Sequence, residues 1–209
     1  MNRLIILSFL LLTSTLSFSQ GNYEKGMQKA LETWQAGKPL EAANIFERIA
    51  AVETENWLPS YYVALINTVE SFSIKDQAAL TAQLSKAKDY LNDAMALSKD
   101  NPELLVVEAQ WYTSWVIFDG QKYGMQYGAK VAQIYEKALA IDPNNPRAAF
   151  GKIEWEMGSA RFFGKPMTPY CDRLVEAIKL YDSFPEQVAF YPMHGKSYGL
   201  SVIESTCNN

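Results

Sequence analysis

Prolines recur along this chain at intervals of about 40 residues, and this period constrains the fold more than any other feature. The prolines concerned are Pro59, Pro102, Pro146 and Pro185. Two of them follow an asparagine, in Asn101-Pro102 and Asn145-Pro146. Each pair predicts a helix start, because asparagine accepts a hydrogen bond from a free backbone amide and proline has no amide to leave unpaired. Helix starts repeated at this interval are typical of an α-solenoid.

The segments between these prolines carry apolar side chains at helical spacing. Ala42, Ala43, Phe46 and Ile49, for example, share one face. Helices are predicted over residues 21–35, 40–52, 59–73, 78–97, 102–118, 123–141, 146–159 and 169–181. No segment alternates apolar and polar residues with a period of two, as a half-buried strand would. We therefore expect an all-α fold without a sheet.

Small and large side chains also stand at intervals of four and three residues in the second helix of the first three units, whereas the fourth keeps Leu174 and Ala177 but has Tyr170 at the small position. The sets are Ala42, Phe46 and Ile49, then Ala87, Leu91 and Ala94, then Val131, Tyr135 and Ala138. The last set leads into the junction Asp142-Pro143-Asn144-Asn145-Pro146. These features resemble the tetratricopeptide repeat (TPR) family. The resemblance implies a right-handed α-α superhelix of about four helix pairs, over 22–56, 57–100, 101–144 and 145–183, with a C-terminal cap over 184–209.

The units are longer than a regular TPR unit of about 34 residues. The extra length falls between the two helices of the second, third and fourth units, so it predicts longer helices or longer connections there. Armadillo and HEAT repeats have periods of roughly 40 residues. The junction and the alanine spacing favour the TPR pattern over these alternatives.

The first 19 residues are expected to be a signal peptide rather than part of the fold. Arg3 is followed by an apolar run from Leu4 to Leu12, and Ser17 and Ser19 precede a cut before Gln20. No cysteine lies near this cut to carry a lipid. No later stretch reaches the roughly 20 apolar residues of a membrane span. We therefore expect export, to the periplasm, the cell envelope or the medium, without a transmembrane span after cleavage.

Composition excludes several classes of function. The chain has 19 basic and 23 acidic side chains, and a net charge of −4 argues against a nucleic-acid partner. His194 is the only histidine, and it follows the last complete unit, where we expect an ordinary structural or partly exposed residue. The chain also has two cysteines, but these residues and the histidine form no motif for a metal site or for a nucleophile and its base. We expect no catalytic residue, no metal and no cofactor.

The first hypothesis for function follows from the resemblance, which implies a non-catalytic module or scaffold that binds a protein or peptide on its concave face. The candidate residues lie on the first helix of units two to four: Val63, Asn67, Glu70, Val106, Gln110, Thr113, Ser114, Phe150, Glu154 and Met157. The alternative is a small-molecule binder or enzyme that uses an aromatic-lined groove near Trp111, Trp115 and Trp155. A convergent polar pocket would distinguish the second hypothesis from the first.

Three further features are open at the level of sequence. Gly120, Gly124 and Gly128 predict either an irregular loop or a closely packed start of a helix. Phe162 and Phe163, in a turn, are expected to fold back on the core rather than contact a partner. Cys171 and Cys207 either form a disulfide that pins the C-terminal cap or remain two free thiols.

Overall fold

The computed structural model describes residues 21–207, and within them the fold is entirely helical. The signal peptide expected at 1–19 lies outside the described residues. The helices are one over residues 21–35, α2 (Pro39–Ala50), α3 (Trp57–Ser71), α4 (Gln77–Leu97), α5 (Pro102–Phe118), α6 (Gly120–Ile141), α7 (Pro146–Phe162), α8 (Thr168–Ser183) and α9 (Lys196–Cys207). The expected all-α class is confirmed for this part of the chain. No helix in it is both long and apolar enough to cross a membrane.

Asparagine caps begin the helices where the sequence predicted them. The side chain of Asn101 accepts a hydrogen bond from the Glu103 amide at 2.9 Å, and Asn145 accepts one from the Ala148 amide at 2.9 Å. Each cap is followed by a proline in the first turn, Pro102 or Pro146. Such caps are each worth about 1 kcal/mol of stability, so they fix where the helices start.

The extra length of the units lies mainly in the helices. Helix α4 has 21 residues, α5 has 17 and α6 has 22. The single residue Asp119 joins α5 to α6 and caps the second of them, because its carboxylate accepts a hydrogen bond from the Lys122 amide. The sequence allowed longer helices or longer connections, and the structure shows that the helices account for most of the extra length.

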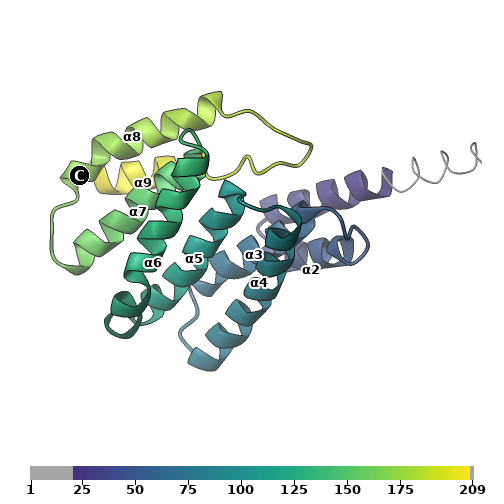
Figure 1. The fold of residues 1–209 in the computed structure, drawn as a ribbon, viewed down its shortest axis with the longest axis horizontal. Coiled ribbons are helices and arrows are strands. Elements are labelled where there is room, and N and C mark those ends of the chain that lie inside the picture. Colours follow the sequence, from purple (N-terminus) through teal and green to yellow (C-terminus); the bar gives the residue numbers. More distant parts are fainter. Residues whose placement is uncertain (1–20, 208–209) are drawn as a thin grey trace, which may run out of the picture.

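Neighbouring helices in the chain pack against one another, as Figure 1 shows for α3 to α7. Helix α5 also contacts α3 and α7, so the first helices of successive units form one layer. The side chains that showed the small and large spacing in sequence all lie in the core: Ala42, Phe46, Ile49, Ala87, Leu91, Ala94, Val131, Tyr135 and Ala138. The apolar pattern therefore predicted the buried face of each second helix.

The three spaced glycines belong to the first turns of helix α6 and not to a loop. A methyl group added to Gly120 would lie 3.2 Å from the ring of Phe162, and one added to Gly128 would lie 3.7 Å from the ring of Trp155. Both rings belong to α7. These glycines therefore let aromatic side chains of α7 lie close to the α6 backbone.

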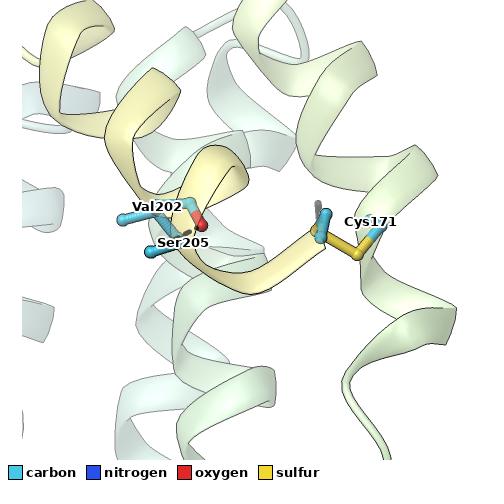
Figure 2. The surroundings of a disulfide bond; sticks show 4 residues. Cys171, Val202 and Ser205 are labelled. Atoms are coloured by element: carbon cyan, nitrogen blue, oxygen red, sulfur yellow. Dashed lines mark hydrogen bonds between the residues drawn. A yellow bond between two sulfur atoms is a disulfide. The ribbon is translucent and has the colours of Figure 1, made fainter. Parts of the chain in front are cut away.

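The C-terminal helix α9 covers α8 and is linked to it by a disulfide. Cys171 of α8 is bonded to Cys207, the last residue of α9, with 5.7 Å between their α-carbons. Figure 2 shows this bond beside Val202 and Ser205, which lie on the preceding turn of α9. Gly199 lies directly against Ile178 of α8, so the two helices approach closely.

The connection between α8 and α9, residues 184–195, does not stay with these two helices. We call it the return segment, because it packs against the first helices of the chain (Figure 1). Phe184 and Tyr191 are buried within it. The segment thereby brings residues from near the end of the chain to those near its beginning.

Candidate functional site

The return segment, the helix over residues 21–35 and α3 line a partly open cavity of about 560 Å³. We call it the aromatic cavity. Its lining residues are Leu31, Trp34, Gln35, Tyr62, Glu186, Ala189, Phe190, Tyr191, Met193 and His194. The volume falls within the range of about 300–1,000 Å³ of small-molecule sites, and a mostly apolar wall with a few polar groups is typical of them.

The return segment is fixed over the cavity by a hydrogen bond and by ring contacts. The hydroxyl of Tyr62 donates to the carbonyl of Phe190 at 2.9 Å. Burial raises the pKa of Tyr62, so this hydroxyl stays protonated. The ring of Phe190 lies 5.8 Å from that of Tyr23, and Tyr191 lies 6.0 Å from Trp57. Phe190 has a φ of 64°, an uncommon value for a residue with a side chain, and the surrounding contacts maintain it.

His194 stands in the wall of the cavity with its ring packed on other rings. The ring centres of Trp34 and Tyr61 are 5.5 Å and 6.4 Å away. Burial, and to a smaller extent the positive charge of Arg147, lowers the pKa of His194 to about 3. The imidazole is therefore neutral at neutral pH. Sequence analysis expected an ordinary structural histidine and did not place it at a cavity.

A buried ion pair lies in the core next to the return segment. The Arg147 guanidinium donates to both carboxylate oxygens of Glu103, at 2.5 Å and 2.6 Å, and the side-chain amide of Asn145 donates to the same carboxylate at 2.6 Å. The guanidinium also lies 4.9 Å from the ring centre of Phe184. This network links α5, α7 and the beginning of the return segment, so it positions one end of the cavity wall.

The ten residues expected on the concave face do not form an open surface. Six of them are buried: Val63, Asn67, Val106, Ser114, Phe150 and Met157. Polar groups of the set bond within the fold, since Asn67 donates to the Val63 carbonyl and Thr113 to the Ala109 carbonyl. The partly exposed Glu154 accepts a hydrogen bond from Tyr198 of α9. None of the ten lines the aromatic cavity.

The aromatic residues of the alternative hypothesis form a packed cluster. Rings of Trp111, Tyr112, Tyr127, Tyr123 and Trp115 contact one another in that order, with centres 5.0 to 6.2 Å apart, and Trp115 closes the circle on Trp111. The Trp111 indole donates to the Leu84 carbonyl at 2.8 Å. Trp155 packs on Gly128. The rings near these tryptophans therefore pack on one another, and the aromatic cavity lies in another part of the fold.

The aromatic cavity was not predicted from the sequence, because six of its ten lining residues come from the return segment. That segment was treated as part of a cap. The available signal was its composition: Phe190-Tyr191-Pro192-Met193-His194 is richly aromatic and apolar for a connection after the last unit. Trp34, on the other wall, is separated from it by nearly the whole chain.

Comparison with known proteins gives a match in structure alone. No protein-family model and no curated protein matches the chain. Among solved structures, the chain is similar to the HusA haemophore from Porphyromonas gingivalis, with a TM-score of 0.75 and 21% sequence identity. The match covers 89% of this chain and 93% of that one. At this level of identity the likeness shows a shared fold.

Proposed function

We propose that this protein binds a flat, apolar small molecule, haem or a related porphyrin, in the aromatic cavity. The observation that carries the proposal is the aromatic wall built by Trp34, Tyr62 and Phe190. The shared fold with a protein described as a haemophore supports the same class of ligand. This function corresponds to the small-molecule alternative drawn from the sequence, at a different site.

The residues of the cavity fit a porphyrin in chemistry as well as in size. Aromatic faces contact a flat conjugated ring favourably, and their burial excludes water. His194 and Met193 offer an imidazole nitrogen and a thioether sulfur, which are atoms that haem iron accepts as ligands in proteins. Glu186 is the one carboxylate of the wall, so the anionic edge of a porphyrin is expected to lie away from it. A bound haem would supply iron and a porphyrin ring as cargo.

We infer further that the chain works by binding and not by catalysis. In the described residues His194 packs on rings and no hydrogen bond joins it to a nucleophile. Both cysteines are used in the disulfide. The earlier hypothesis of a protein partner on the concave face has less support, because most of the residues chosen for it are buried.

The finer architecture and the location are also proposals. We propose a TPR-like right-handed superhelix, supported by the repeated Asn-Pro helix starts and by the pairing of consecutive helices. We propose that the protein is exported. The disulfide supports this, because disulfides persist in oxidising compartments, and so does the shared fold with a protein described as a haemophore.

The test is a titration of the disulfide-bonded protein with haemin and with iron-free protoporphyrin IX. Porphyrin absorption and tryptophan fluorescence measure the binding. Trp34→Leu removes the main flat side chain of the cavity, and we expect it to weaken binding about tenfold, since an aromatic contact with its buried area is worth over 1 kcal/mol. Trp155→Leu, outside the cavity, serves as the matched control and should bind normally.

The outcomes separate the possible sites. If neither porphyrin binds to the wild-type protein, the proposed function is wrong. If Trp155→Leu abolishes binding while Trp34→Leu does not, the ligand lies in the region of the original alternative. Binding of both porphyrins would indicate that contacts with the porphyrin ring provide the affinity. Binding of haemin alone would indicate that the affinity comes from the bond between the iron and His194 or Met193.

A further inference from the structure

A second feature lies away from the aromatic cavity, where α7 ends and α6 begins. Phe162 and Phe163 are 60% and 69% exposed there, and their rings meet edge to face at 5.2 Å. The ring of Phe162 lies against Gly120, at the start of α6. Ile117 and Met125, on the adjoining helices, are 49% and 92% exposed. We call the two phenylalanine side chains the apolar tip. The expectation that the two phenylalanines fold back on the core is wrong.

The short turn that follows α7 keeps these rings at the surface. Phe163 ends the helix and Gly164 adopts a φ of +67°, which lets the chain reverse toward α8. Only the residues 163–167 join the two helices, so no length of chain is available to cover the rings. Two adjacent exposed phenylalanines are unusual on a protein that has no contact at that surface.

Basic side chains surround the apolar tip. Arg161 and Lys165 flank the two phenylalanines in sequence, and Lys122 lies in the first turn of α6. None of the three forms an ion pair within residues 21–207. Of the neighbouring carboxylates, Asp119 caps α6, Glu156 is paired with Arg173, and the half-buried Glu154 bonds to Tyr198. Asp119 and Glu154 keep their negative charges, so the three basic side chains leave this region with a small net positive charge on a chain with a net charge of −4.

From this arrangement we propose that the apolar tip docks on a membrane surface that contains anionic lipid. Exposed aromatic side chains enter the boundary between headgroups and acyl chains, and adjacent lysine and arginine side chains contact lipid phosphates. The negative charge of the rest of the molecule is screened beyond about 8 Å at physiological salt, so the basic side chains at the contact dominate.

The same charges disfavour the other simple occupant, a second copy of the chain. A symmetric dimer through the tip would place the same patch of both copies face to face, and Arg161 and Lys165 would then oppose their own copies. An anionic surface complements these charges. The inference concerns a face separate from the aromatic cavity, so it does not depend on the proposed function.

The experiment measures co-sedimentation of the protein with vesicles. One set contains phosphatidylcholine alone and the other contains phosphatidylcholine and phosphatidylglycerol in equal parts. We expect the wild-type protein to bind the second set and to be released by salt. Phe162→Ser with Phe163→Ser should weaken binding about tenfold, because it removes apolar area that enters the interface. Arg161→Gln and Lys165→Gln should each weaken it about fivefold.

Matched controls change equally exposed side chains elsewhere. Val52→Ser with Val188→Ser, and Lys25→Gln with Lys75→Gln, should bind the anionic vesicles like the wild-type protein. Circular dichroism verifies that every variant is folded. Failure of the wild-type protein to bind anionic vesicles overturns the proposal, as does undiminished binding by the tip variants. A dimer in light scattering that is lost in the phenylalanine variant would assign the tip to a second copy instead.

Discussion

Burial holds the pKa of His194 well below its ordinary value, and this makes the stability of the fold depend on pH. The folded protein holds its pKa at about 3, while an unfolded chain has the ordinary value of 6.5. Between these values the unfolded state binds a proton that the folded state does not. The free energy of unfolding therefore falls as the pH is lowered from 6.5 toward 3, by up to about 1.4 kcal/mol per pH unit from this residue.

The expected result is a difference between two pH profiles. Urea unfolding of the wild-type protein should lose stability between about pH 6.5 and about pH 5, and His194→Gln, which cannot titrate, should lose less. Carboxylates titrate mostly below this window and cancel in the comparison. Parallel profiles for the two proteins would show that His194 is not shielded as the structure indicates.

At this scale the sequence predicted the residues whose roles are local. Asn101 and Asn145 act on amides within the next turn, so their function is readable from the neighbouring residues. The concave-face residues were placed by analogy with a shorter unit, and in α3, α5 and α7 six of the ten positions are buried. His194 lines a cavity through contacts with Trp34 and Tyr61, for which the sequence gives no local signal.

Helix α7 offers a direct test of how closely neighbouring elements approach. A methyl group on Gly151 would come within 2.9 Å of three atoms of the buried Tyr135 side chain, whereas one on Gly158 would meet nothing within 4 Å. We expect Gly151→Ala to lower the free energy of unfolding by about 1–3 kcal/mol through overpacking against α6. Gly158→Ala should raise it by up to about 1 kcal/mol, because alanine is the better helix former.

Chemical denaturation of the two variants gives the comparison, and each serves as the other's control because the substitution and the helix are the same. Equal effects of the same sign would mean that α6 and α7 are not packed as closely as the structure has them. A small cost at Gly151 with no change in helix content would indicate that Tyr135 moves aside.

The predictability of each element depended on whether its contacts are near in sequence. Helices from residue 21 to α8 carry their own periodic faces, and α3 to α7 also carry side-chain caps, so they were predicted within a few residues. The return segment has no period, and its position depends on a hydrogen bond from Tyr62 to Phe190 across most of the chain. The tip at Phe162 was missed for the opposite reason, since apolar residues are ordinarily buried and the short turn leaves these two outside.

For the whole molecule, the disulfide decides how firmly the C-terminal end is held. Cys171 and Cys207 are 36 residues apart in sequence. Closing a loop of this length in the unfolded chain stabilises the folded state by up to about 4 kcal/mol in chain-entropy models. We expect the variant with Cys171→Ser and Cys207→Ser to be less stable by an amount approaching this value, while porphyrin binding persists because neither cysteine lines the aromatic cavity.

Unfolding in urea, with the wild-type protein oxidised or reduced, measures this contribution. The reduced wild-type protein should behave like the serine variant, which separates loss of the bond from loss of the sulfur atoms. If the oxidised and reduced proteins unfold at the same urea concentration, the bond does not stabilise the fold.

The aromatic cavity depends on contact between two parts of the chain that are far apart in sequence, the return segment and the first helices. A solenoid ordinarily tolerates loss of a terminal repeat, because each repeat contacts only its neighbours. Here one wall comes from Trp34 and the other from His194, so the pocket forms only when the return segment has folded back over the first helices. By the same geometry, a single proteolytic cut among the exposed residues 185–189 would leave every helix intact, and the Cys171–Cys207 disulfide would still join the wall with Phe190 and His194 to the rest of the chain.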